Sequence, residues 1–188
     1  NEFVGHPLLD YKDDKAIDIN QVIGKNKALI SVFPGSRKSE IEVLTPILLQ
    51  TIKLLNQSNK DITYVFHSTK EYSSSIQTHI SKSELINCEV ISDDKIKSHV
   101  LRKSIFAIAK SGTVSLEISN LKIPSIILYK MNFINFLIVK MLVKTKFANI
   151  INIAAKKEII PELLQGDCNP RNISNKTIDF LDNPGKMR

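Results

Sequence analysis

Cysteine and glycine are scarce in this chain of 188 residues, which has two cysteines, six glycines and no tryptophan. Cys88 and Cys168 lie far apart and form no CxxC pair or Cys/His cluster. Their spacing argues against a zinc site or a disulfide scaffold and suits a reducing cytosol. The glycines do not form GxGxxG, GxxxxGKS/T or GxSxG. These absences exclude the dinucleotide-binding fingerprint, the P-loop and the serine-hydrolase turn.

Long apolar runs and aromatic residues are also few. The longest apolar stretch, residues 133–143, is interrupted by Lys140 and is too short to span a bilayer. Aromatic residues make up 6% of the chain, which leaves few platforms for stacking nucleic acid bases. No RRM, KH or helix-turn-helix signature occurs. A nucleic-acid-binding module is therefore kept only as an alternative.

Positive charge is in excess, with a formal net charge of +7. A basic balance fits an anionic partner such as a nucleotide, a phospholipid surface or nucleic acid. It also fits the background of a sequence that is rich in lysine, isoleucine and asparagine. Charge alone does not choose between these partners.

Apolar runs alternate with helical patterns along the chain. Five short apolar runs are typical of buried strands: residues 28–33, 62–66, 86–91, 105–109 and 124–129. Helices are expected at residues 41–55, 70–82, 93–103, 114–120, 133–143, 161–165 and 170–181, with a short apolar piece at 147–153. This rhythm predicts a doubly wound, Rossmann-like α/β domain whose parallel sheet is covered on both faces.

The first candidate site is the turn Pro-Gly-Ser-Arg at residues 34–37, between the first strand and the first helix. In doubly wound folds, ligands lie outside the carboxyl ends of the strands, where this turn is expected. A helix N-terminus offers unpaired N–H groups, and Arg37 would add a two-pronged grip on a phosphate or diphosphate. The alternative is a solvated Arg37 with Ser36 or Ser39 as a helix cap, since Ser39 and Glu42 match a capping box.

The second candidate site is the turn Lys-Ser-Gly-Thr at residues 110–113, which also follows a strand. Gly112 lets the backbone approach a ligand, and Ser111 and Thr113 offer hydroxyls beside free N–H groups. Glu117 lies one helical turn further and is placed to accept hydrogen bonds from two sugar hydroxyls. Together these positions would fit a nucleotide. The alternative is an ordinary capped helix with a solvated glutamate.

Two further features have structural alternatives. His67, at the end of the second strand, is expected on the ligand side of the sheet, near a donor sugar. Residues 129–147 combine apolar side chains with lysines. This pattern is typical of a basic amphipathic helix on an anionic membrane surface, and equally of a helix that is packed on the sheet with its lysines reaching solvent.

Seven motifs follow one another along the chain, at residues 3–10, 33–41, 109–117, 124–130, 143–145, 149–153 and 161–170. In this order they resemble the C-terminal half of the lipid-A-disaccharide synthases, a family of two-domain GT-B glycosyltransferases. The resemblance extends from residue 1 to about Asn172. Each motif alone is only moderately specific, and the shared order makes coincidence a poor explanation.

The resemblance implies a transferase. Enzymes of this family transfer a diacylated glucosamine from UDP-2,3-diacylglucosamine to 2,3-diacylglucosamine 1-phosphate, release UDP and need no metal or other cofactor. In GT-B enzymes the C-terminal domain holds the nucleotide diphosphate, and the N-terminal domain provides the acceptor site and the general base. We therefore expect residues 1–26 to end an interdomain linker and residues 27–188 to form the UDP-sugar-binding domain. Without the N-terminal domain, the chain should bind UDP weakly and not turn over.

The resemblance also implies roles for the residues of the two turns. Arg37 would act catalytically by neutralising the diphosphate as charge builds on the leaving group. Ser36 belongs to the same substrate-binding turn. Ser111, Gly112 and Thr113 would donate hydrogen bonds to the phosphates.

Four further residues are assigned to the donor site by the resemblance. Glu117 would bind the ribose. Asn152 matches a polar family position near the active cleft, and Glu162 and Gln165 match the Pro-Glu-Leu-Leu-Gln run. Lys110 departs from the family, in which a small residue is commoner at this position. It would either add a cation near the diphosphate or point to solvent.

The implied setting is the cytoplasmic side of the inner membrane of a Gram-negative bacterium, with the protein peripheral on that surface. The implied partners are the two acylated sugars, the membrane surface and the protein's own N-terminal domain. A homodimer is left open, and no nucleic acid is expected.

The alternatives are another UDP-sugar GT-B enzyme, such as an epimerase or a peptidoglycan glycosyltransferase, and a non-catalytic basic module that binds nucleic acid. Other GT-B enzymes are not expected to combine the Pro-Gly-Ser-Arg and Pro-Glu-Leu-Leu-Gln runs.

Overall fold

The computed structural model describes residues 28–58, 61–131, 147–183 and 185. Its strands are β1 (Ala28–Phe33), β2 (Ile62–His67), β3 (Cys88–Ile91), β4 (Phe106–Lys110), β5 (Ser125–Tyr129) and β6 (Glu162–Leu164). Its helices are α2 (Lys38–Asn56), α3 (Lys70–Ser83), α4 (Asp94–Lys103), α5 (Val114–Asn120), α7 (Ile150–Ala155) and α8 (Pro170–Asp182). The expected linker over residues 1–26 and the expected helix over 133–143 lie outside the described residues.

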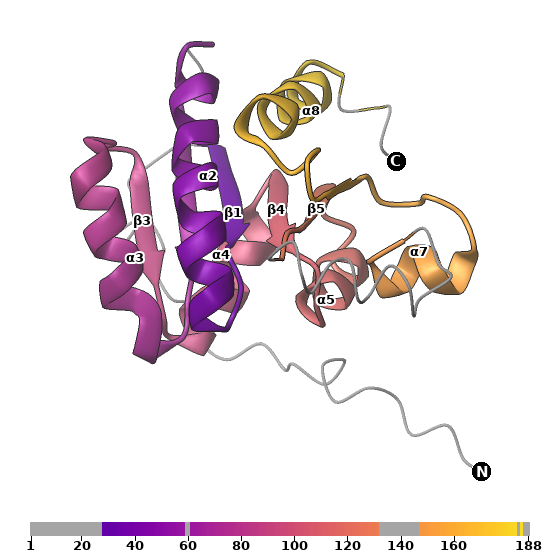
Figure 1. Ribbon diagram of the computed structural model, residues 1–188, viewed down its shortest axis with the longest axis horizontal. Coiled ribbons are helices and arrows are strands. Elements are labelled where there is room, and N and C mark those ends of the chain that lie inside the picture. Colours follow the sequence, from indigo (N-terminus) through magenta and orange to yellow (C-terminus); the bar gives the residue numbers. More distant parts are fainter. Residues whose placement is uncertain (1–27, 59–60, 132–146, 184, 186–188) are drawn as a thin grey trace.

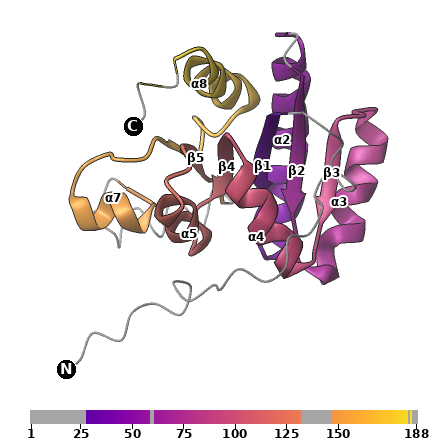
Figure 2. The same cartoon turned by 180° about the vertical axis from the view of Figure 1, so that it is seen from behind.

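The strands form one parallel sheet in the order β3-β2-β1-β4-β5-β6. Helices α2 and α3 lie in front of this sheet in Figure 1, whereas α4 and α5 lie in front of it when the molecule is seen from behind in Figure 2. The predicted doubly wound α/β fold is confirmed. Since side chains alternate between the two faces of a strand, both faces must be apolar, which explains the near-continuous apolar runs.

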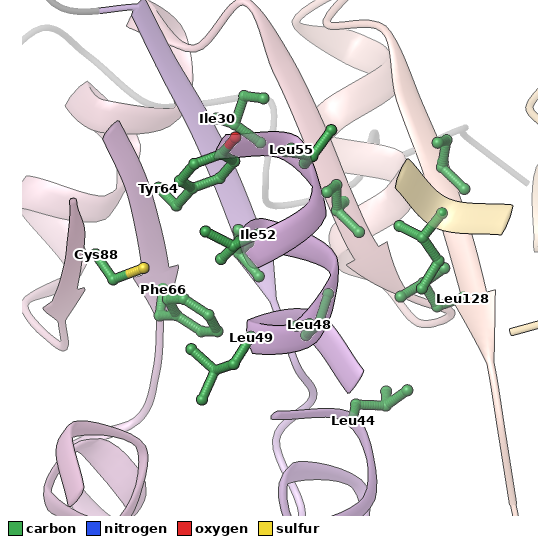
Figure 3. Packing of buried hydrophobic residues seen from close by; sticks show 14 of the residues in the cluster. Ile30, Leu44, Leu48, Leu49, Ile52, Leu55, Tyr64, Phe66, Cys88 and Leu128 are labelled. Atoms are coloured by element: carbon green, nitrogen blue, oxygen red, sulfur yellow. The ribbon is translucent and has the colours of Figure 1, made fainter. Parts of the chain in front are cut away.

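The larger core lies between the sheet and the helices α2, α3 and α8. In Figure 3, Leu48 and Ile52 of α2 lie over Ile30 of β1 and over Tyr64 and Phe66 of β2. All five side chains are at most 1% exposed. Burial of a side chain of this size contributes about 1.5–3 kcal/mol, so this layer contributes substantially to the stability of the fold.

Helix α8 returns the end of the chain to the face that α2 covers. Asn169 caps α8 by accepting a hydrogen bond from the N–H of Asn172, and Pro170 occupies the first turn, where no N–H is needed. The ring of Phe180 stacks on Phe106 of β4 with centroids 4.7 Å apart. The expected helix over residues 170–181 is therefore confirmed.

Two expectations about single elements are wrong. Residues 162–164 form strand β6 instead of a helix, because Leu163 pairs with Leu128 of β5 and is buried there. The short apolar piece over 147–153, for which no element was expected, contains the start of helix α7. The third strand begins at Cys88, and Ile86 is 97% exposed. Local apolar patterns do not show whether a neighbouring strand is available for pairing.

The strand order changes direction between β1 and β4. Strand β1 leads through α2 to β2 on one side, whereas β4 leads through α5 to β5 on the other side and on the opposite face. Phe33 and Ala109, near the ends of these two strands, are paired in the sheet. In an open α/β sheet the loops diverge at such a point and leave a crevice for a ligand.

Candidate functional site

Both turns that the sequence singles out lie at this switch point. The turn at residues 34–37 follows β1, and the turn at residues 111–113 follows β4. Because β1 and β4 are neighbours in the sheet, the two turns stand side by side at its carboxyl edge. The juxtaposition expected from the sequence is therefore present in the fold.

A glutamate of the first turn of α2 connects the two turns. The Oε2 atom of Glu40 accepts a hydrogen bond of 3.1 Å from the N–H of Ser36. Its Oε1 atom lies 2.8 Å from Nζ of Lys110 and 3.7 Å from Nη1 of Arg37. Two cations, one from the first turn and one from the end of β4, thus reach a single carboxylate oxygen at the switch point.

The electrostatics of this contact favour an ionised Glu40. Burial alone would raise the pKa of its carboxyl, but the ion pair with Lys110 and the N–H of Ser36 outweigh burial, so the pKa is lowered. The side chains of Glu40 and Lys110 are 13% and 19% exposed, whereas that of Arg37 is 79% exposed. The guanidinium therefore faces solvent and can turn toward a ligand.

The capping box expected at Ser39 and Glu42 is wrong. Helix α2 begins at Lys38, and its N-cap is Arg37, whose side chain makes no capping hydrogen bond. Glu42 instead lies 3.8 Å from Lys38 in an exposed ion pair. Because the sequence pattern assigned the cap to Ser39 and Glu42, it did not single out Glu40. An acid in the first turn of a helix is a recognised signal of a helix N-terminus.

In the second turn, the three predicted phosphate-binding residues have different surroundings. Ser111 is buried, and its hydroxyl donates a hydrogen bond of 2.8 Å to the carbonyl of Ala148. Gly112 and Thr113 are exposed, and the hydroxyl of Thr113 makes no capping bond. A Cβ atom built on Gly112 would meet nothing closer than the carbonyl of Lys110 at 4.0 Å. Within the part of the chain that the structure describes, nothing crowds the tip of this turn.

Glu117 lies one turn into α5, as expected, and is half-buried. Burial raises the pKa of its carboxyl, the charges of Arg102 and Lys97 on α4 act in the opposite direction, and Asp94 adds to the increase. The solvated glutamate of the alternative interpretation is therefore wrong. The carboxylate faces the basic side of α4, on the same face of the sheet as α5.

Asn152 is wholly buried and uses its amide within the protein. Its Oδ1 atom accepts hydrogen bonds from the N–H groups of Ile159 and Ile160, at 2.8 and 3.0 Å. Its Nδ2 atom donates to the carbonyl of Ile160 and to Oε1 of Glu162, at 2.7 and 2.6 Å. These four bonds fold the segment after α7 back toward β6.

Glu162 continues the same network. Its carboxylate accepts hydrogen bonds from the N–H of Ala148, at 2.6 Å, and from the N–H of Asn149, at 3.1 Å. The carbonyl of Ala148 in turn accepts the hydroxyl of Ser111. Asn152 and Glu162 thereby hold the loop that supports the second turn. Their predicted contact with the donor stays a prediction.

Gln165 lies just after β6 in the left-handed region, with φ of 47°. Its Oε1 atom accepts from the N–H of Met131, and its carbonyl accepts from Nζ of Lys130. Its Nε2 atom is buried and, within the described part of the chain, has no hydrogen-bond partner. Buried polar groups are normally paired, so this Nε2 donor is an exception among the described residues.

His67 takes part in a buried hydrogen-bond chain. The hydroxyl of Ser104 donates to the carbonyl of Val100 at 2.9 Å, so the hydroxyl of Ser31 donates to Ser104 at 2.7 Å. Ser31 then accepts from Nε2 of His67 at 2.8 Å. This order places the imidazole proton on Nε2 and leaves Nδ1 without a partner among the described groups.

The surroundings of His67 keep its ring neutral. Burial, helped by the charge of Lys97, lowers the pKa of His67 from 6.5 to about 3. The ring stacks on Phe33 with centroids 4.1 Å apart. His67 therefore links β2 to the end of β1, and its predicted approach to a donor sugar stays a prediction.

Among residues 28–58, 61–131 and 147–183, no three His, Cys, Asp or Glu side chains are grouped so that they could hold a metal ion. In the part of the chain that the structure describes, no helix has both the length and the apolar character to cross a membrane.

Comparison with known sequences identifies the family. The family model described as LpxB, lipid-A-disaccharide synthetase, matches residues 1–188. The lipid-A-disaccharide synthase of Sulfurihydrogenibium sp. (strain YO3AOP1) is 36% identical over 191 residues, covering 95% of this chain and 49% of that protein. The lipid-A-disaccharide synthase of Rickettsia prowazekii (strain Madrid E) is 34% identical, covering 98% and 49%. The chain spans about half the length of the curated relatives it matches.

Solved structures share the fold. Escherichia coli ADP-heptose lps heptosyltransferase II matches with a TM-score of 0.63 at 8% identity, covering 88% of this chain and 50% of that chain. The C-terminal domain of a glycosyl transferase group 1 family protein from Francisella tularensis matches with a TM-score of 0.57 at 13% identity, covering 96% and 89%. UDP-GlcNAc 2-epimerase from Neisseria meningitidis, bound to UDP-GlcNAc, matches with a TM-score of 0.61 at 13% identity, covering 90% and 40%. At these identities the likeness establishes the architecture alone.

The family assignment rests on the sequence match and agrees with the fold. The model match extends over the whole chain, and both curated relatives align through almost all of it. The resemblance that was read from seven ordered motifs is confirmed. The chain belongs to the lipid-A-disaccharide synthetase family.

Proposed function

We propose that the protein is a lipid-A-disaccharide synthase and that residues 27–188 form its UDP-sugar-binding domain. One structural observation carries the proposal. The two turns predicted to bind phosphate meet at the switch point, where Arg37 and Lys110 share one oxygen of Glu40. The whole-chain family match supports the identity of the donor as a UDP-sugar.

Arg37 is the residue that we assign to the chemistry. Transfer of the sugar leaves negative charge on the diphosphate of UDP, and a preorganised cation stabilises that charge. The guanidinium is 79% exposed, and its ion pair within the described residues is a contact of 3.7 Å to Glu40. It is therefore free to form a two-pronged contact with phosphate oxygens. Ser36 belongs to the same turn.

The second turn would hold the same diphosphate from the other side. The open space over Gly112 admits a phosphate close to the backbone, and Thr113 offers its hydroxyl beside it. Ser111 fixes the loop at Ala148. Glu117, one turn deeper, would accept hydrogen bonds from the ribose hydroxyls.

The remaining residues of the donor site divide into two groups. Asn152 and Glu162 position the loop at residues 147–149, because their polar atoms bind one another and the backbone. Gln165 keeps a buried Nε2 donor that suits an oxygen of the donor. The acceptor, 2,3-diacylglucosamine 1-phosphate, and the general base would belong to the half of the family that this chain does not span.

Isothermal titration with UDP tests the proposal. The 188-residue chain should bind UDP in a saturable way without transferring sugar. Arg37→Ala should weaken binding at least about tenfold, as expected for loss of a charged hydrogen bond. Arg171→Ala, which removes an exposed arginine from the start of α8, serves as the matched control. Equal affinities of Arg37→Ala and wild type would refute the role of Arg37.

We also propose that the protein lies on the inner membrane surface. Three isoleucines of α7 and the following loop are exposed, Ile150 by 55%, Ile153 by 41% and Ile159 by 54%. Two exposed lysines at residues 156 and 157 accompany them. An apolar patch with basic residues suits an anionic lipid surface.

Liposome sedimentation tests this second proposal. Ile150→Glu with Ile153→Glu should reduce binding to vesicles that contain anionic lipid. Ile86→Glu is the control, because Ile86 is 97% exposed next to β3, at the opposite end of the sheet. Equal sedimentation of the two variants would remove the α7 patch from the proposal.

A further inference from the structure

Among the described residues, Glu40 is the only acid whose carboxylate contacts both the turn at 34–37 and Lys110, which precedes the turn at 111–113. It receives the N–H of Ser36 from the first turn and the ammonium of Lys110 from the end of β4. Glu40 lies within the motif at residues 33–41, and Lys110 is the last residue of β4. The pair is largely buried, with side chains 13% and 19% exposed. A buried pair of this kind fixes geometry more effectively than a solvated one.

Gly35 is shaped to this carboxylate. Its φ is +122°, a conformation that side-chain-bearing residues rarely adopt. A Cβ atom at this position would lie 2.5 Å from Oε2 and 2.7 Å from Cβ of Glu40. The glycine thus leaves the room that Glu40 occupies. The turn and the acid fit each other.

We propose that Glu40 is a positioning residue for the diphosphate site and that Lys110 is its structural partner instead of a phosphate ligand. The Glu40–Lys110 pair fastens the turn at 34–37 to the turn at 111–113. Arg37 and Gly112 then face the same ligand from two sides. This inference rests on the proposed binding of UDP.

If Glu40 positions the site, its removal should weaken UDP binding. Coulomb's law alone predicts the opposite effect. A carboxylate beside an anion-binding site repels a diphosphate, so its removal should tighten binding. The ammonium of Lys110 at 2.8 Å offsets that repulsion and leaves the charge of Arg37 for the ligand. The sign of the effect of removing Glu40 therefore distinguishes positioning from simple charge.

A double-mutant cycle in the 188-residue chain tests the proposal. We expect Glu40→Ala and Lys110→Met each to weaken UDP binding about tenfold, and the double variant to be no weaker than either alone. Glu42→Ala is the matched control, because Glu42 lies in the same helix turn in an exposed pair with Lys38. It should bind as wild type does. Tighter binding by Glu40→Ala, or an undiminished effect of Lys110→Met in the Glu40→Ala background, would overturn the proposal and make Lys110 a direct ligand.

A second readout needs no ligand. The amide proton of Ser36 should shift in NMR spectra when acid protonates Glu40, and Lys110→Met should move the midpoint of that shift to higher pH. Arg37 and Lys110 are the charged groups that contact Glu40 in the described chain. If Lys110→Met leaves the pH midpoint of the Ser36 amide shift unchanged, the proposed connection between the turns is wrong. Failure of wild type to bind UDP would refute the proposed function while leaving this readout to decide the role of Glu40.

Discussion

The turn at Arg37 and the corner formed by Asn152 and Glu162 carry motifs of the same family, yet their polar side chains differ in exposure and in hydrogen bonding. The side chain of Arg37 is 79% exposed and, among the described residues, makes one ion-pair contact, of 3.7 Å, to Glu40. Asn152 is wholly buried and makes four hydrogen bonds. The first arrangement leaves a cation free for a ligand. The second fixes a loop.

The comparison shows that a shared motif does not by itself identify a binding residue. A buried amide must be paired inside the protein, so its hydrogen bonds are committed before a ligand arrives. An exposed guanidinium keeps its donors in water and can exchange them for phosphate oxygens. Exposure and hydrogen-bond saturation separate the two roles, and the following variants test that separation.

The largest expected effect is on stability. Asn152→Ala removes four hydrogen bonds and leaves Glu162 and two backbone N–H groups with fewer partners, so the free energy of unfolding should fall by about 3 kcal/mol. Urea unfolding followed by circular dichroism measures the loss. Asn175→Ala, at an exposed position of α8, should change stability by less than about 0.5 kcal/mol. Similar losses in the two variants would contradict a special role of Asn152.

A pH-dependent loss of stability is next in size. The pKa of His67 is lowered from 6.5 to about 3 in the folded protein, so the unfolded chain binds its proton more readily. Its contribution is complete above pH 6.5 and declines as the pH falls toward 3. Between pH 7.5 and 5 the decline is about 2 kcal/mol.

Urea titrations at both pH values measure this decline. His67→Gln keeps a donor for Ser31 but cannot be protonated, so it should lose about 2 kcal/mol less stability over the same interval. An unchanged pH dependence in His67→Gln would indicate that other groups cause it.

A smaller effect, on UDP affinity, is expected when the guanidinium of Arg37 is replaced by an ammonium group. Arg37→Lys keeps the cation but loses the planar fork, so UDP affinity should fall about fivefold while the free energy of unfolding stays the same. Titration calorimetry and urea unfolding give the two values, with Arg171→Lys as the control. A loss of stability that matches the loss of affinity would indicate that Arg37 has a structural role, as Asn152 does.

The smallest stability change is expected at the tip of the second turn. Gly112→Ala should alter the free energy of unfolding by less than about 0.5 kcal/mol, because the nearest atom to a new Cβ is 4.0 Å away. UDP affinity should nevertheless fall, since the methyl group occupies the space reserved for a phosphate. Gly166→Ala, whose new Cβ would meet no described atom within 4 Å, should leave affinity unchanged. Equal UDP affinities of Gly112→Ala and wild type would mean that the ligand does not approach this turn.

Most of the fold could be predicted from the sequence because its signals are local. Residues 28–33 are apolar except for Ser31 and are followed by a Pro-Gly break, and the spacing in 38–56 is helical, so both elements follow from neighbours in the chain. Strand β6 could not be predicted, because three residues form a strand only where β5 offers a free edge. The same limit applies to the site. Arg37, Gly112 and Thr113 are recognisable in their turns, whereas the partner of Lys110 lies 70 positions away in the sequence numbering, at Glu40.

The amino-acid order by itself determined the alternation of strands and helices, the two glycine-containing turns and the family. Only the tertiary structure decided which polar side chains remain available to a ligand and which are consumed in holding loops together. The physical reason is that hydrogen-bond pairing and burial depend on distances between segments remote in the chain. A sequence pattern carries no such distances.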